Sequence, residues 1–220
     1  MSSIDETGGR FSGPHKEVQS APAPRVNCFT PGTLISTPRG EVPIERIGVG
    51  DTIVTRDNGV QEVRWIGRKT LSGPALRFDT RLHPVRIRAG ALGPDLPARD
   101  LCVSPNHRLL LVGEHPELDA GESEVFVSAK HLLGTRGVER VEPVEVTYLH
   151  LMFDRHEVVL SEGAWTESFH PTDEALDAAG EASRDELFEL FPELRDAATR
   201  RTRRAARRTL AAGEAKRLRA

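Results

Sequence analysis

The chain has 220 residues, enough for one domain of about 100–200 residues with tails. It contains no apolar run of the ~18 residues that a membrane-spanning helix needs, and the N-terminus lacks the charged and apolar regions of a secretory signal. The two cysteines lie in neither a CxxC nor a Cys/His pattern, which excludes a disulfide framework and a structural zinc site. We therefore expect a cytoplasmic protein with reduced thiols and no cofactor.

The net charge of −3 is unevenly distributed along the chain. Residues 195–220 contain ten Lys and Arg and only two acidic residues, so that residues 1–194 carry a charge of −11. A basic segment of this kind can attract nucleic acid, anionic lipid or the acidic body of the same chain. Arginine-rich helices that only face solvent are also common, and we expect no nucleic-acid partner.

The first two segments of the chain differ sharply in composition. Residues 1–27 are rich in Gly and Pro with little to bury, which predicts a disordered leader. From residue 28 to about residue 170, short β-prone runs such as "TLISTP", "LCVSPNHRLLLV" and "VEPVEVTYLHLMF" alternate with turn residues. The Asn58-Gly59 pair between β-prone flanks predicts a hairpin. Many short strands without long helical periods predict an all-β domain over 28–170.

The last fifty residues have a helical pattern instead. Ser183 has the spacing of a capping box before "LFELF", and Pro192 ends that short helix. A second helix is predicted from about residue 193 to residue 212, with Gly213 as its stop. We expect residues 171–220 to form a short, Arg-rich α-helical tail appended to the β-domain.

Cys28 stands at the first position of the predicted domain, which suggests a chemical role. Its sulfur can reach the carbonyl carbon of Asn27 through a five-membered ring and convert the Asn27–Cys28 peptide bond into a thioester. An ordinary thiol has a pKa of about 8.5 and an amide is a poor acyl donor, so the site must supply proton transfer and oxyanion donors. Histidine suits the proton transfers. The segment "SPNH" offers both Ser104 and His107 at one turn.

In combination, these segments resemble the Hint domains, the module shared by inteins and the autoprocessing half of hedgehog proteins. "CFTPGTLISTPRGEVPIERIGVGDTIVTRD" resembles the opening block, "SPNHRLLL" the TxxH block with Ser in place of Thr, and "HEVVLSEGAWTESF" the closing strands. The resemblance covers about residues 27–169. It is strongest to a bacterial subgroup that shares "CFTPGT", "SPxH" and the "HEvv…ESF" ending. The fold that it implies is a β-horseshoe of intertwined antiparallel strands.

The resemblance also implies roles for individual residues. Cys28 would be the nucleophile of an N–S acyl shift, His107 would act on the nitrogen of the scissile bond, and Ser104 would hydrogen-bond that bond and hold it distorted. The family also has an acid, usually Asp, in the strand before the closing block. His150 and Asp154 are both candidates for this position. The spacing H-x-x-x-D-x-H from residue 150 to residue 156 is compatible with a metal site as well, although we expect none.

Two departures from the family pattern shape the expected reaction. Splicing inteins end in His-Asn, and that asparagine cyclises, but here Glu167 and Ser168 stand at this place. We therefore expect self-cleavage or acyl transfer rather than splicing, with the leader as substrate and water or a thiol as second nucleophile. Cys102 shares a strand face with Ser104, so a disulfide to Cys28 is an alternative to a simple core position. The alternative function is an inert Hint fold that binds partners through its basic tail.

Overall fold

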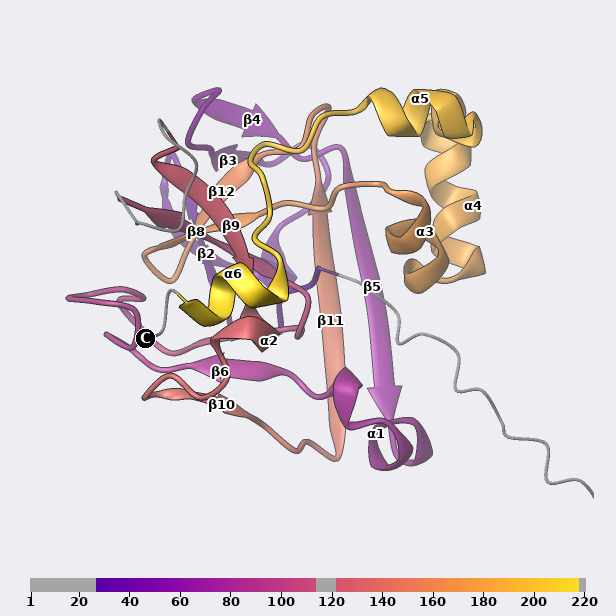
Figure 1. Cartoon of the computed structure of the whole chain (residues 1–220). Coiled ribbons are helices and arrows are strands. Elements are labelled where there is room, and N and C mark those ends of the chain that lie inside the picture. Colours follow the sequence, from indigo (N-terminus) through magenta and orange to yellow (C-terminus); the bar gives the residue numbers. More distant parts are fainter. Residues whose placement is uncertain (1–26, 114–121, 218–220) are drawn as a thin grey trace, which may run out of the picture.

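The computed structural model describes residues 27–113 and 122–217, so the predicted disordered leader lies outside the described residues except for Asn27. The described part is built mainly of short antiparallel strands with helices gathered toward the C-terminus (Figure 1). The strands are β1 (Leu34–Thr37), β2 (Gly40–Pro43), β3 (Thr52–Val54), β4 (Val60–Glu62), β5 (Trp65–Ser72), β6 (Val85–Ile87), β7 (Leu101–Val103), β8 (Arg108–Val112), β9 (Glu124–Ser128), β10 (Val138–Arg140), β11 (Glu145–Met152), β12 (Val158–Ser161) and β13 (Ala164–Glu167). The helices are α1 (Pro74–Phe78), α2 (Ala129–Leu132), α3 (Asp173–Ala179), α4 (Glu181–Leu190), α5 (Ala197–Thr202) and α6 (Ala212–Arg217), with 3-10 turns at Ile44–Arg46, Thr80–Leu82 and Pro192–Arg195. The predicted all-β class of the body is confirmed.

The strands form four antiparallel groups. The largest has the order β2-β1-β12-β13-β8-β9, and a second has the order β10-β6-β7. The long strands β5 and β11 pair over eight residues each and form a ribbon along the molecule (Figure 1). The neighbours β1 and β12 lie more than a hundred residues apart in the chain, which gives the intertwined topology.

The predicted hairpin at Asn58-Gly59 is confirmed. It joins β3 to β4, and Thr55 N donates a hydrogen bond to Gly59 O at 2.7 Å. Gly59 has a φ of +67°, a left-handed conformation that glycine adopts without steric cost. The turn residues therefore set the register of this pair.

The tail differs in part from the two helices that we expected. Helix α4 begins at Glu181, before Ser183, and ends at Leu190 ahead of Pro192 as predicted. The predicted helix over 193–212 is wrong, because that range holds the end of the 3-10 turn Pro192–Arg195, the short helix α5 and the first residue of α6, and Gly213 lies inside α6. Between these helices the chain runs extended along β9 and forms a parallel bridge from Thr209 to Phe126.

The tail arginines account for this difference. Arg207 forms ion pairs with Asp57 and Glu124, and Arg208 forms ion pairs with Glu122 and Glu214. Backbone hydrogen bonds of 2.8 Å from Phe126 N to Arg208 O and from Leu210 N to Phe126 O hold the same stretch. The basic tail is thus bound to the acidic body, and tertiary contacts override its helical propensity.

The apolar residues form two main clusters that matter for the site. The larger lies between the sheets and includes Ile35, Ile53, Val103 and Leu109. The second joins Cys28 and residues of the β5–β11 ribbon to the tail helices; its members include Trp65, Tyr148, Met152, Phe169, Leu176, Ala178, Leu187 and Leu194. Helices α3 and α4 accordingly lie beside the ribbon in Figure 1. Among the described residues, no helix is long and apolar enough to span a membrane.

Candidate active site around Cys28

Cys28 is held between two strands that are distant in sequence. The next residue, Phe29, forms antiparallel bridges with Val103 of β7 and with Leu149 of β11. Reciprocal backbone hydrogen bonds of 2.9 Å link Phe29 and Leu149. Because β7 leads directly into Ser104 and β11 continues directly to His150, this short pairing brings both side chains to Cys28. The Cys28 side chain is buried as a result, with 2% of the residue exposed.

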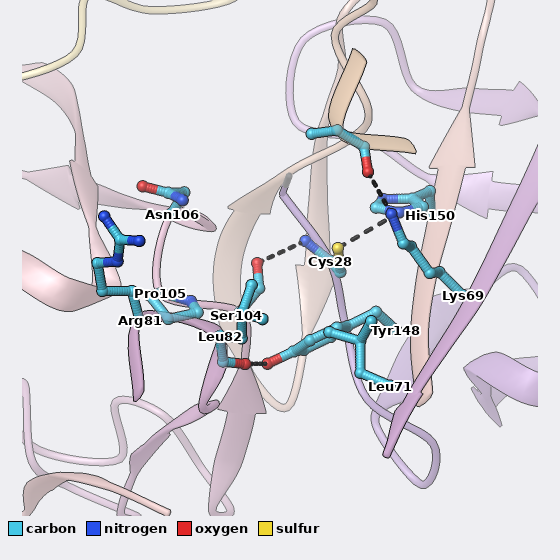
Figure 2. A pocket seen from close by; sticks show the side chains of 11 residues that line it. Cys28, Lys69, Leu71, Arg81, Leu82, Ser104, Pro105, Asn106, Tyr148 and His150 are labelled. Carbon is cyan, nitrogen blue, oxygen red and sulfur yellow. Dashed lines mark hydrogen bonds between the residues drawn. The ribbon is translucent and has the colours of Figure 1, made fainter. Parts of the chain in front are cut away.

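Ser104 binds the nitrogen side of the Asn27–Cys28 peptide bond. Cys28 N donates to Ser104 Oγ at 2.9 Å (Figure 2), and Ser104 N in turn donates to Cys28 O at 2.9 Å. The resemblance assigned the Ser104 hydroxyl to the Asn27–Cys28 bond, and in the structure this hydroxyl contacts the nitrogen of that bond. His107 N donates to Ser104 O at 3.0 Å, which closes the predicted turn.

His150 contacts the sulfur of Cys28 and the oxygen of the carbonyl group that this sulfur would attack. Its Nε2 lies 3.3 Å from Cys28 Sγ, and its Nδ1 lies 2.9 Å from Asn27 O. A carbonyl oxygen can only accept a hydrogen bond, so Nδ1 carries the proton and the lone pair of Nε2 faces the thiol. The thiol of Cys28 therefore donates to His150, and His150 donates to the carbonyl that the sulfur would attack.

Aromatic side chains enclose the His150 ring. Trp65 stacks on it with centroids 6.2 Å apart and planes at 12°, and Phe169 meets it edge-on at 5.3 Å. Gly67 pairs directly with His150 across the ribbon, and a Cβ at this glycine would lie 2.2 Å from Trp65 Cη2. Because Gly67 has no side chain, the indole of Trp65 can occupy this space.

Burial sets the protonation states of this pair. It raises the pKa of the Cys28 thiol well above its ordinary value, outweighing the hydrogen bond with Ser104 and the charge of Lys69. Burial also lowers the pKa of His150 to about 4. At neutral pH the site therefore contains a neutral thiol hydrogen-bonded to a neutral imidazole.

His107 is fully buried near the same peptide bond. Its ring packs edge-on against Phe29 with centroids 4.4 Å apart. Burial lowers the pKa of His107 to about 4, against the opposing effects of the Glu167 carboxylate and the Asn27 backbone. Within the described part of the chain no side chain bonds either ring nitrogen at full hydrogen-bond geometry, and the Asn27 backbone is the polar group that acts on the ring. This ring is therefore a candidate for proton transfer at the Asn27–Cys28 bond.

The remaining residues of the H-x-x-x-D-x-H spacing do not gather at Cys28. The Asp154 side chain is 72% exposed and forms an ion pair with Arg64. His156 Nδ1 accepts a hydrogen bond from Ala206 N, and its ring stacks on His170. Across residues 27–113 and 122–217 there is no group of three potential metal ligands. Of the two candidates for the assisting residue, the structure brings His150 to the thiol and leaves Asp154 at the surface.

Glu167 and Ser168, which stand in place of the terminal His-Asn of inteins, are both buried. Glu167 Oε1 accepts hydrogen bonds from Arg108 N and Arg108 Nε at 2.8 and 2.9 Å. Although burial opposes its ionisation, Arg108 and the neighbouring histidines hold the pKa of Glu167 below its usual value. Ser168 Oγ accepts from Glu157 N at 2.8 Å. Both side chains are thus engaged in the framework behind the site.

Lys69 lies at the site although no motif pointed to it. It stands opposite Tyr148 on the ribbon, and its Nζ donates to Ala178 O at 2.8 Å, at the end of α3. Lys69 and Ala178 line a cavity of about 60 Å³ beside Cys28 (Figure 2). The other lining residues are Leu71, Arg81, Leu82, Ser104, Pro105, Asn106, Tyr148 and His150. Cys102 and Cys28 are both free thiols.

The antiparallel β-fold and the arrangement around Cys28 can now be compared with known proteins, and the comparison identifies the family of this chain. The family model described as "Hint domain" matches residues 27–173, about two thirds of the chain. The chain therefore belongs to the Hint domain family, as the sequence motifs predicted.

Solved structures with similarity to the chain include inteins and a bacterial intein-like domain. A splice-inactive variant of the AceL NrdHF class 3 split intein has 14% identity and a TM-score of 0.40, covering 65% of this chain and 99% of that chain. The bacterial intein-like domain from Clostridium thermocellum has 13% identity and a TM-score of 0.39, covering 66% and 99%. No curated protein matches the sequence.

Proposed function

We propose that this Hint domain performs an N–S acyl shift at the Asn27–Cys28 peptide bond and thereby cleaves itself. The observation that supports this most strongly is the double contact of His150, at 3.3 Å from the Cys28 sulfur and 2.9 Å from the Asn27 oxygen. One ring is thus in position to act as base toward the nucleophile and as donor toward the developing oxyanion.

In the first half of the shift, the sulfur of Cys28 attacks the carbonyl carbon of Asn27. The thiol proton passes to Nε2 of His150, and negative charge develops on the Asn27 oxygen. Nδ1–H already donates to that oxygen, and the new imidazolium charge strengthens this hydrogen bond. A neutral pair becomes an ion pair only in the transition state, which favours the transition state over the ground state.

In the second half, the carbon–nitrogen bond breaks and the amide nitrogen of Cys28 leaves as an amine. Ser104 Oγ holds that nitrogen at 2.9 Å. The nitrogen gains one proton, and His150 holds the one proton that the sulfur lost, so the shift needs no external acid. We assign to His107, buried beside Asn27, the relay of this proton from His150 to the amine nitrogen, so that both rings end neutral.

The thioester is expected to end in cleavage rather than splicing. No asparagine stands at the end of the module, and Glu167 and Ser168 at that place are engaged by Arg108 and Glu157. Water or a thiol would then attack the thioester and release residues 1–27. The alternative, an inert domain that binds partners through its tail, is less well supported because Arg207 and Arg208 already bind acidic residues of the same chain.

Intact-mass measurement during incubation at neutral pH tests this function. We expect a product shortened by residues 1–27, formed faster with hydroxylamine or dithiothreitol and absent in Cys28→Ala and His107→Ala. Cys102→Ala is the matched control, because it removes the other thiol and should cleave like the unchanged chain. A folded chain that keeps its full mass in strong thiol would contradict the proposal and favour the inert alternative.

A further inference from the structure

We propose that the cavity beside Cys28 binds the acyl acceptor, and that helix α3 of the tail restricts this acceptor to nucleophiles of a few non-hydrogen atoms, with water foremost. The acceptor role rests on the proposed function. The size limit does not, because it applies to any reagent that approaches the sulfur of Cys28.

The cavity volume sets the limit. It is about 60 Å³, whereas about 10–15 Å³ of such space is enough to hold one water molecule. There is room for a few waters, or for the reactive end of a short thiol or amine. Cys28, His150 and Ser104 form part of the wall, so a molecule in the cavity would lie beside the future thioester.

Packing holds the tail side of this wall in place. Ala178 of α3 lines the cavity, and its carbonyl oxygen accepts the hydrogen bond from Lys69 Nζ at 2.8 Å. Leu176 of the same helix and Leu187 of α4 are buried in the apolar cluster that also contains Cys28. Thr172 Oγ1 accepts from Ala175 N and caps the start of the helix. A larger acceptor would therefore have to displace packed residues, not a loose segment.

The lining is largely apolar, and its two charged side chains are already engaged, Arg81 by Asp79 and Lys69 by Ala178 O, which favours a small neutral nucleophile. Leu71, Leu82 and Ala178 provide apolar surface. Tyr148 Oη already donates to Leu82 O at 2.7 Å, and the ammonium group of Lys69 donates to Ala178 O (Figure 2). These polar groups hold the wall itself together.

Discharge of the thioester follows from this placement. The acceptor, written H–X, attacks the carbonyl carbon of Asn27, a C–X bond forms and the C–S bond breaks. The proton of the acceptor passes to Nε2 of His150 and from there to the sulfur. The products are residues 1–27 ending in Asn27–X and a chain that begins with Cys28 bearing a free thiol. With water as acceptor, the leader ends in a carboxylic acid.

Alkylation of Cys28 tests the size limit without any cleavage. In a Cys102→Ala background, we expect iodoacetamide to label the folded chain at least about tenfold faster, relative to a free cysteine, than the bulkier N-ethylmaleimide, since single methylenes in a pocket change rates about 10–200-fold. Ala178→Leu should slow labelling by iodoacetamide by at least about tenfold. Ala178→Gly should reduce the difference in labelling rate between iodoacetamide and N-ethylmaleimide.

Ala179→Leu is the matched control, because Ala179 is the next buried residue of α3 but does not line the cavity. Equal effects of Ala178→Leu and Ala179→Leu, or equal relative labelling by both reagents, would overturn the size limit. Cleavage tests the acceptor role. We expect 2-mercaptoethanol to release the leader at least about tenfold faster than glutathione, and Ala178→Gly to reduce this difference in cleavage rate. Equal cleavage rates with the two thiols would overturn the acceptor role. Size-selective labelling without cleavage by any nucleophile would keep the size limit and overturn both the proposed function and the acceptor role.

Discussion

Replacement of His150 is the perturbation that separates the two roles assigned to this ring. His150→Ala removes the Nε2 acceptor of the thiol proton and the Nδ1–H donor to the Asn27 oxygen. Loss of a general base typically costs about 10²–10⁴-fold in rate, and loss of one oxyanion donor about 10²–10³-fold. Because one ring does both, the two losses do not simply add. We expect His150→Ala to slow cleavage by at least about 10³-fold.

His150→Asn distinguishes the roles, because an asparagine amide can donate near the Nδ1 position but cannot act as a base. It should recover part of the loss, up to about 10²-fold over His150→Ala. Asp154→Asn is the control. It changes the other candidate residue, whose side chain is 72% exposed and paired with Arg64, and it should leave the rate unchanged.

The assay is the first-order loss of full-length chain in hydroxylamine, followed by intact mass, with near-ultraviolet circular dichroism to verify folding. If folded His150→Ala cleaved at the rate of the unchanged chain, neither role assigned to His150 would stand. If Asp154→Asn abolished cleavage while His150→Ala did not, the assisting residue would be Asp154.

Three further predictions concern the surroundings of the site. Ser104→Ala leaves the buried N–H of Cys28 without its acceptor, so it should destabilise the fold by about 1–3 kcal/mol in urea unfolding and slow cleavage, whereas Ser104→Thr should retain both properties. Gly67→Ala places a Cβ 2.2 Å from Trp65 Cη2, so it should destabilise the fold by about 1–3 kcal/mol, alter tryptophan fluorescence and slow cleavage by disturbing His150. Stability should also depend on pH. Three buried histidines have pKa values of about 4 in the folded chain, below the ordinary value of about 6.5. Between these two pH values the unfolded chain therefore binds more protons than the folded chain. Stability should be full above about pH 6.5 and fall by on the order of a few kcal/mol toward pH 4 in thermal melts. The histidines concerned are His107, His150 and His170.

Each of these has its own contradicting outcome. A Ser104→Ala chain as stable and active as the unchanged one would mean that its hydroxyl contributes nothing at the amide nitrogen. Unchanged fluorescence and rate in Gly67→Ala would show that Trp65 does not position His150. A melting temperature that stays constant from pH 7 to pH 4.5 would contradict the burial of neutral histidines.

The sequence motifs predicted the parts of the site that depend on local chain geometry. Cys28 and the turn from Ser104 to His107 are contiguous segments, and the backbone bond from His107 N to Ser104 O closes that turn. The choice between His150 and Asp154 could not be made in this way. Strand alternation puts both on one face, but β11 ends at Met152, so the alternation no longer applies at Asp154.

Long-range contacts account for what the sequence analysis missed. Gly67 and Lys69 act through partners about eighty or more residues away, namely His150 across the ribbon and Ala178 in the tail. Single-residue patterns carry no information on such pairings. The predicted helix over 193–212 failed for a related reason, since ion pairs and strand-like hydrogen bonds with the body hold that stretch extended.

The most direct test of the central claim is to trap the acyl group of Asn27. Hydroxylamine should release residues 1–27 with a hydroxamate at the C-terminal carbonyl of Asn27, identified by tandem mass spectrometry, and leave a chain beginning with Cys28. This product requires an activated acyl group at that carbonyl and should be absent in Cys28→Ala. Cleavage at another bond, a hydroxamate that still forms in Cys28→Ala, or a folded chain that keeps its full mass would contradict the thioester account.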